Sequence, residues 1–181
     1  MLRRSNNSRL DWARGRVFVQ GNVAAAKGPR VSAAIAAWLL LCCGMVFVMV
    51  VLGGLTRLTH SGLSMVEWQP LSVLPPFSEA EWEATFAKYR LSPEFRLVNS
   101  DMTLAGFKGI FWLEYIHRLW GRTIGLVFAL PLAFFFLKRM IDAPLARRLA
   151  GILLLGGLQG LMGWVMVKSG LVDAPDVSHY R

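Results

Sequence analysis

Residues 31–54 read VSAAIAAWLLLCCGMVFVMVVLGG and contain no charged side chain. A helix of roughly 20 such residues crosses a bilayer core of about 30 Å. Each backbone N–H and C=O group must find its partner within the segment there, so a helix is the only plausible form for this block. We therefore predict a first transmembrane span near residues 32–53.

Two further blocks are long enough to span a bilayer. Residues 110–137 carry several ionisable side chains in their first half, whereas residues 146–167 are interrupted only by Arg147 and Arg148 near their start and by Gln159, which places the third predicted span near residues 149–168. The 181-residue chain is 55% hydrophobic, above the ~45–50% of a usual soluble domain. The sequence predicts an all-α integral membrane protein with three transmembrane helices. A buried soluble helix is the alternative for the third block.

The charges are distributed unevenly around these spans. The formal net charge is +9; basic residues gather in residues 1–31 and 138–148, whereas residues 54–109 carry both signs. This is the positive-inside distribution, which we favour over a surface that binds nucleic acid. It predicts a multi-pass protein of the bacterial plasma (inner) membrane with a cytoplasmic N-terminus and residues 54–109 outside. An Arg- and Ser-rich start leaves a mitochondrial transit peptide, and the mitochondrial inner membrane, as the alternative.

The outward segment 54–109 contains a signal for a further helix. The run SEAE at 78–81 has the pattern of a capping box, and Trp82, Phe86 and Tyr89 follow at spacings of four and three residues. We expect a short amphipathic helix on the membrane surface. We also expect three tryptophans in the interfacial aromatic belt: Trp68, Trp82 and Trp112.

Ionisable side chains are concentrated in the second span, which reads FWLEYIHRLWGRTIGLVFALP from Phe111. Such residues are costly inside a membrane and are functional candidates by default. Helical geometry sorts them into two neighbouring stripes. The stripes are Glu114, Arg118 and Arg122, and His117, Gly121 and Gly125.

This surface has the groups that a haem needs. Imidazole is a common axial ligand of haem iron, so His117 is the candidate ligand, and Gly121 and Gly125 leave room for a flat molecule. Arginines such as Arg118 and Arg122 bind carboxylates. Glu114, three residues before His117, is placed to orient the histidine or to transfer a proton. The equally weighted alternative is a buried salt-bridge cluster of Glu114 with the arginines.

A second histidine ligand is not evident. His60 follows the first span and His179 lies near the end of the chain, and we expect both to be exposed or hydrogen-bonded rather than bound to iron. Cys42 and Cys43 are adjacent in the first span, so they cannot form an ordinary disulfide and are interpreted as apolar filler. In the third span, GGLQGLMG is a face of small residues suited to close helix contact, and we expect Gln159 to bond to another helix.

Several long motifs resemble one known family. The stretch GGLTRLTHSGLSMVEWQPLSVLPP at 53–76 is similar to the start of the first outward segment of haem A synthase, in the version shared by mitochondria and alphaproteobacteria. The similarity continues through EWEATFAKYRLSPEFRLVN and MTLAGFKGIFWLEYIHRLWGR, then LQGLMGWVMVKSGL at 158–171 and VSHYR at 177–181. It covers roughly residues 50–181, with the motifs in matching order and spacing.

The resemblance implies a function and a site. Haem A synthases oxidise the C8 methyl group of haem O to a formyl group, with water as the oxygen source, and give haem A for cytochrome c oxidase. The family has two similar four-helix halves, of which the N-terminal one receives haem O and the other holds haem b. The resemblance places this chain in the N-terminal half, with Glu114 as catalytic carboxylate and His117 as iron ligand. Residues such as Arg57, Arg118 and Arg122 would then meet the haem carboxylates.

The resemblance also sets the expected partners and alternatives. Residues 32–181 would form the N-terminal half up to a missing fourth span, with the haem b site in a missing C-terminal half. Expected partners are haem O, the lipid bilayer, haem O synthase, cytochrome oxidase assembly factors and a second copy of the chain, with no nucleic acid. The alternatives are a haem-binding membrane cytochrome fragment without catalysis and a structural membrane assembly factor.

Overall fold

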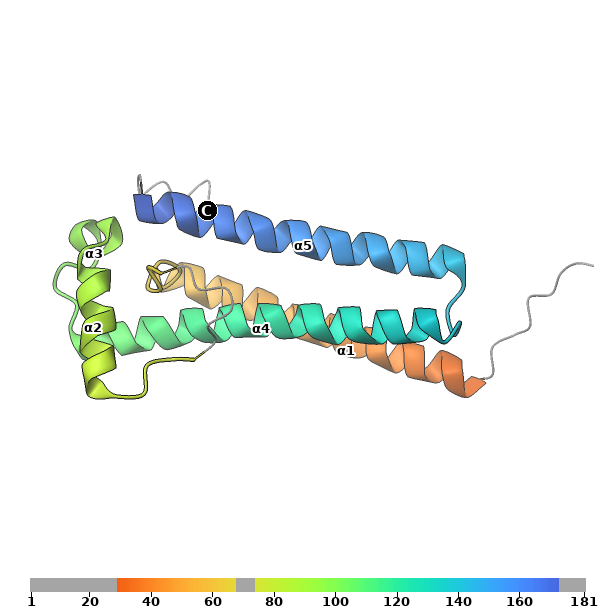
Figure 1. The fold of residues 1–181 in the computed structure, drawn as a ribbon. Coiled ribbons are helices and arrows are strands. Elements are labelled where there is room, and N and C mark those ends of the chain that lie inside the picture. Colours follow the sequence, from red (N-terminus) through yellow and green to blue (C-terminus); the bar gives the residue numbers. More distant parts are fainter. Residues whose placement is uncertain (1–28, 68–73, 173–181) are drawn as a thin grey trace, which may run out of the picture.

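The computed structural model describes residues 29–67 and 74–172, and the other residues lie outside the described part of the chain. The described residues form five helices and no strand. In chain order they are α1 (Pro29–Leu58), α2 (Glu79–Arg90), α3 (Pro93–Leu97), α4 (Leu104–Leu137) and α5 (Ala143–Val172). Helix α4 contacts both α1 and α5, and α2 and α3 lie at one end of this group (Figure 1).

The three long helices, α1, α4 and α5, have the length and apolar composition of membrane spans. The predicted all-α membrane fold is therefore confirmed for the described residues, whereas a fourth span stays a prediction. Each helix extends beyond the span predicted for it. Helix α4 begins at Leu104 rather than residue 110, because Thr103 Oγ1 accepts a hydrogen bond from the backbone N–H of Gly106 (3.3 Å) and caps the helix.

A tight turn joins α4 to α5. Arg139 takes a φ of 54°, and the backbone N–H of Met140 donates to the carbonyl of Phe135 (2.8 Å). These features are those of a Schellman motif, which ends a helix on a left-handed residue. Asp142 Oδ1 then accepts a hydrogen bond from the N–H of Leu145 (3.2 Å) and caps the first turn of α5. Helix α5 therefore runs back antiparallel along α4 (Figure 1).

A second Schellman motif ends α1 at the opposite end of the bundle. The N–H of Ser61 donates to the carbonyl of Thr56 (3.0 Å), and the N–H of His60 donates to the carbonyl of Arg57 (3.3 Å). His60 has the left-handed φ of 50° that the motif requires. This reversal directs residues 61–66 back toward α4.

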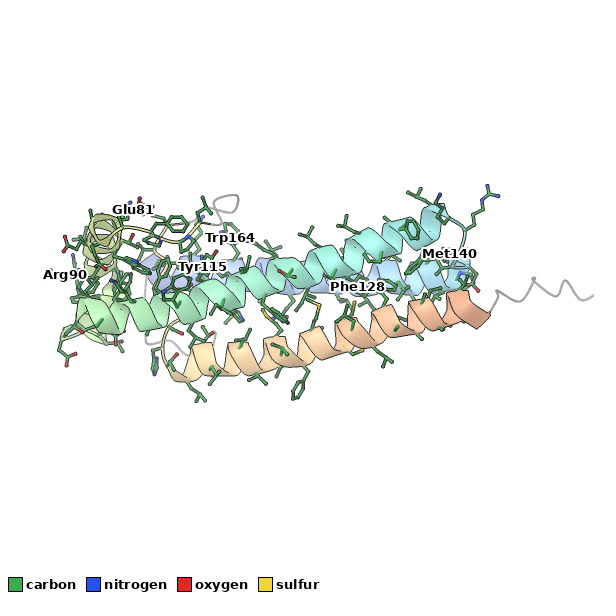
Figure 2. All side chains as sticks on the ribbon, turned by 90° about the horizontal axis from the view of Figure 1, so that it is seen from below. Glu81, Arg90, Tyr115, Phe128, Met140 and Trp164 are labelled. Atoms are coloured by element: carbon green, nitrogen blue, oxygen red, sulfur yellow. The ribbon has the colours of Figure 1, made fainter. Side chains whose placement is uncertain are left out.

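An apolar core joins the long helices at the end where α4 turns into α5. The Trp38 ring of α1 packs against Phe128 and Phe135 of α4, with ring centroids 5.3 and 5.4 Å apart. Its Nε1–H donates a hydrogen bond to the Val127 carbonyl (2.8 Å). Figure 2 shows Phe128 and Met140 in this part of the bundle. The core therefore fixes α1 against α4 by both shape and a polar contact.

A cap of short helices covers the other end of α4. The predicted capping box is present: Ser78 Oγ accepts from the N–H of Glu81, and the Glu81 carboxylate accepts from the N–H of Ser78. The predicted helix α2 follows it. Helix α3, which the sequence analysis did not predict, follows the N-cap residue Ser92, whose Oγ accepts a hydrogen bond from the N–H of Phe95 (3.3 Å). The residue after Ser92 is Pro93, a usual first residue of a helix.

The apolar stripe of α2 packs on α4, and a position of this helix at the membrane surface stays a prediction. The Trp82 ring lies 5.0 Å from that of Phe111, and Tyr89 is stacked 5.1 Å from Phe107. Trp82 is only 7% exposed, so it is a core residue of the cap. Trp112 is 40% exposed, and Trp68 lies outside the described residues.

Helix α5 is the least covered of the long helices. None of its most apolar stretch is buried, and Gln159 is exposed, with no side-chain hydrogen bond to another helix among the described residues. The expected contact of Gln159 is therefore absent there. The face of small residues also meets nothing: a Cβ added at Gly156 or Gly160 would have no neighbour within 4 Å. In α1, Cys42 is buried in the core, as expected of apolar filler, and Cys43 is exposed.

Candidate functional site

Glu114 is the centre of a buried polar network on α4. Its side chain is only 2% exposed. Ser64 Oγ donates to Glu114 Oε2 (2.6 Å), and the backbone N–H of Met65 donates to the same oxygen (2.8 Å). The Arg118 guanidinium donates to the other oxygen, Oε1, one turn along the helix. Charge-assisted bonds of this kind are about twice as strong as neutral ones.

The network depends on the turn that follows α1. The reversal at His60 brings Ser64 and Met65 against α4, and Ser61 and Ser64 are both almost fully buried. The contact between Ser64 and Glu114 joins residues fifty positions apart in the sequence. Glu114 thus fixes the segment after α1 to α4, in addition to any chemical role.

His117 lies on the side of α4 that faces α1. A Cβ added at Gly53 of α1 would lie 3.4 Å from His117 Nε2, so the imidazole points at the glycine backbone. One turn further along α4, a Cβ at Gly121 would meet the Met49 side chain at 3.3 Å, whereas one at Gly125 would meet nothing within 4 Å. Gly121 therefore serves the close packing of α1 and α4, and Gly125 leaves open space.

The three predicted arginines do not gather at one point. Arg118 joins the Glu114 network, as described above. Arg122 is half-buried on α4 and forms no ion pair with Glu114. Of the predicted salt-bridge cluster, the pair of Glu114 with Arg118 is present and the pair of Glu114 with Arg122 is not. Arg57 is exposed near the end of α1.

The histidines other than His117 take no part in this site within the described residues. His60 is exposed, as expected, and serves the turn after α1. His179 lies outside the described residues. Within residues 29–67 and 74–172, no group of three or more His, Cys, Asp or Glu side chains is arranged to hold a metal ion.

A pocket of about 290 Å³ adjoins the network on the α5 side. Arg118 lines it from α4 and Trp164 and Lys168 line it from α5, together with Met65, Val66, Glu67, Val167 and Leu171. Trp164 lies at the end of the bundle that carries the cap, as does Tyr115 (Figure 2). The polar groups of the site therefore continue from Glu114, through Arg118, to the surface of α5.

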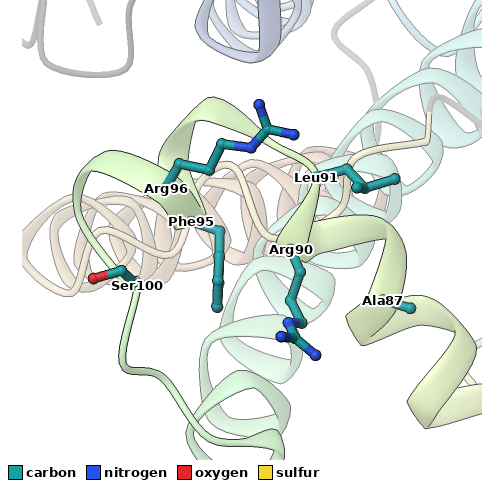
Figure 3. Close-up of a pocket in the computed structure, with 6 residues that line it drawn as sticks. All are labelled: Ala87, Arg90, Leu91, Phe95, Arg96 and Ser100. Carbon is teal, nitrogen blue, oxygen red and sulfur yellow. The ribbon is translucent and has the colours of Figure 1, made fainter.

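A second pocket, of about 510 Å³, lies on the cap and is separate from this site. It is lined by Ala87, Arg90, Leu91, Phe95, Arg96 and Ser100. Figure 3 shows its two arginines, Arg90 and Arg96, pointing in opposite directions. Because they do not converge on one point, this pocket does not form a binding site for a single anion.

Sequence reasoning missed four residues of the site: Gly53, Ser64, Met65 and Lys168. The pairing of Ser64 with Glu114 depends on the turn after α1, whose geometry no periodic pattern indicates. Gly53 opens the GG pair that ends the first apolar block, and this pair was the only available signal of a close helix contact. Lys168 ends an apolar run in the third span, where a lone charge is a functional candidate by default.

Comparison with known proteins gives a consistent result. A family model described as cytochrome oxidase assembly protein matches residues 36–181. A heme A synthase of Paramagnetospirillum magneticum is 62% identical over 148 residues, which cover 81% of this chain and 42% of that protein. Heme A synthases of Nitrosospira multiformis and Rhodospirillum centenum are 58% and 55% identical, over 42% and 43% of their lengths. The chain thus spans less than half the length of these curated relatives. No solved structure matches.

Proposed function

The chain belongs to the cytochrome oxidase assembly protein family, and from this membership we propose that it provides the haem O site of a haem A synthase. The observation that carries the proposal is the buried Glu114, held in a fixed position one turn from His117. The relatives named heme A synthase support the choice of reaction. The overall activity belongs to a protein of the relatives' full length, so this chain's part in it is the proposal.

The residues of the site fit a haem. His117 is the proposed axial ligand of the iron through Nε2, which lies beside the bare backbone of Gly53 on α1. Gly125 adds open space on the same helix. Bound haem O would bring the iron and the methyl group that is oxidised. The residues of the chain would hold the macrocycle near Glu114 and limit the access of bulk water.

The reaction itself defines what Glu114 must do. Conversion of a methyl group to a formyl group takes up one water molecule and releases four protons and four electrons. A carboxylate beside the reacting carbon accepts protons as they leave. Ser64, Met65 and Arg118 hold the Glu114 carboxylate in one orientation for this role. The electrons pass to an acceptor, for which we propose the haem b of the family's other half.

The setting of this reaction is also part of the proposal. We place the cap of α2 and α3 on the outer side of a bacterial inner membrane and the α4–α5 turn on the cytoplasmic side, because Lys138, Arg139, Arg147 and Arg148 gather at that turn. Haem O synthase, cytochrome oxidase assembly factors and a second copy of the chain stay predicted partners.

A structural role of Glu114 is the second candidate. The carboxylate joins the outward segment to α4, and breaking a buried ion pair by removing one partner typically costs about 3–5 kcal/mol. A variant at position 114 can therefore lose function by unfolding alone. The experiment has to separate this loss from a loss of chemistry.

The proposed test places residues 36–181 in the corresponding part of the Paramagnetospirillum magneticum relative and expresses the chimaera in cells that make haem O. With Glu114→Ala we expect no haem A, while haem O stays bound to the purified protein. Haems are extracted and separated by chromatography. A normal yield of haem A from the variant would contradict the catalytic role.

Ser64→Ala serves as the matched structural control. It removes one hydrogen bond from the network, worth about 1.5–3 kcal/mol for a bond to a charged group, and leaves the carboxylate in place. We expect lower thermal stability, while haem A is still formed. If Ser64→Ala abolished haem A as completely as Glu114→Ala, the structural role of the network would be the better account.

A further inference from the structure

The pocket beside Arg118 has an excess of positive charge. Its cationic residues are Arg118 and Lys168, and its only acidic residue is Glu67. Arg118 is paired with Glu114, and Glu67 is paired with Lys88 at 2.7 Å, so Lys168 carries the positive charge that the pocket has in excess. No carboxylate of the described residues lies within salt-bridge distance of Lys168. Its Nζ instead lies over the Trp164 ring, 5.2 Å from the centroid.

The size of the pocket indicates what part of a ligand it takes. Sites that enclose whole small molecules usually measure about 300–1,000 Å³, and this pocket measures about 290 Å³. It therefore suits a side arm of a larger ligand better than a whole macrocycle. Trp164 and Leu171 give it an apolar wall, and the two cations give it a preference for an anionic group.

The position of the pocket relates it to the proposed haem site. Arg118 follows His117 in the sequence, so its side chain leaves α4 about 100° further round the helix. His117 faces α1, and Arg118 faces the pocket against α5. A flat ligand held at His117 would extend one edge toward the side of α4 that carries Arg118. The edge of a haem carries carboxylates, which Arg binds through a fork of donors and Lys as a point charge.

We propose that Arg118 and Lys168 bind a carboxylate arm of the haem substrate in this pocket, and that Lys168 determines specificity for the free acid. The inference rests on the proposed function, because it takes His117 as the centre of the haem site. Arg118 also holds Glu114, so a carboxylate in the pocket contacts the same guanidinium that orients the proposed proton acceptor.

The test compares two probes that differ only in their carboxylates: haemin and haemin dimethyl ester. The full chain is placed in nanodiscs of phosphatidylcholine, so that no anionic lipid headgroup competes. Binding is followed by the Soret absorbance. We expect wild type to bind haemin about tenfold more tightly than the ester, a difference of about 1.4 kcal/mol. Lys168→Gln should lose most of this preference, and Lys168→Arg should keep it.

Lys138→Gln is the matched control, because it removes the same charge at the opposite end of the bundle, and we expect it to behave as wild type. If Lys168→Gln kept the full preference for haemin, or if the control lost it equally, the inference would be wrong while haem binding by His117 stood. If wild type bound neither probe through His117, the proposed function would fail and the inference with it.

Discussion

At the scale of single residues, Glu114 and His117 differ in how completely their surroundings hold them. The carboxylate of Glu114 accepts hydrogen bonds from a serine hydroxyl, a backbone N–H and a guanidinium. His117 is half-buried, and its nearest constraint is the bare backbone at Gly53. Preorganised groups of this kind are needed where charge changes during a reaction.

The position of Gly53 beside His117 predicts that valine substitutions at Gly53 and at Gly54 will affect haemin binding differently. A Cβ at Gly53 would lie 3.4 Å from His117 Nε2, whereas one at Gly54 would meet nothing within 4 Å. We expect Gly53→Val to weaken haemin binding at least tenfold, because its methyl groups occupy the approach to Nε2. Gly54→Val should bind as wild type. Soret titrations of the two variants check this, and equal affinities would show that Gly53 does not border the haem site.

At the scale of elements, the sequence predicted those features that depend on local pattern. The three long helices follow from apolar blocks, and α2 follows from the capping box at Ser78. The packing of the α2 stripe on α4 was beyond prediction, because periodicity shows which face is apolar and not which residues cover it. The contact between Ser64 and Glu114 was also beyond prediction, because it depends on how the turn at His60 aims the chain.

The junction of α1 and α4 yields a prediction about stability. Trp38 contributes both ring contacts and a hydrogen bond to Val127. Interhelical hydrogen bonds in membranes average about 0.6 kcal/mol, and loss of ring packing adds to this. We expect Trp38→Phe to lower the free energy of unfolding by about 1 kcal/mol. Phe47→Leu, at a side chain 70% exposed, should have little effect. Denaturation in mixed micelles compares them, and equal values would contradict the role of Trp38.

At the scale of the whole molecule, the two ends of the bundle have different characters. One end has the α4–α5 turn with its basic residues, and the other has the cap, the Glu114 network and the Lys168 pocket. Helix α5 has little cover over its apolar length, whereas α4 is packed between its neighbours. The proposed site therefore lies at one end of the helix group, opposite the basic α4–α5 turn.

This asymmetry predicts the orientation in the membrane. A reporter fused after Met140 should be cytoplasmic, and a reporter fused after Lys88 should lie on the other side, because the positive-inside rule retains the basic turn in the cytoplasm. Paired phosphatase and fluorescent-protein fusions measure both positions. The reverse pattern would place the haem site on the cytoplasmic side and overturn the proposed topology.

The account depends most on the claim that His117 holds haem O. The direct measurement is the haem extracted from the purified chain after expression in cells that make haem O, for wild type and for His117→Ala. We predict that haem O is recovered with the wild type and that the variant retains at most about one-tenth of it. This loss corresponds to an affinity for haem O that is lower by about tenfold or more. Equal recovery from both proteins, with both folded, would contradict the claim.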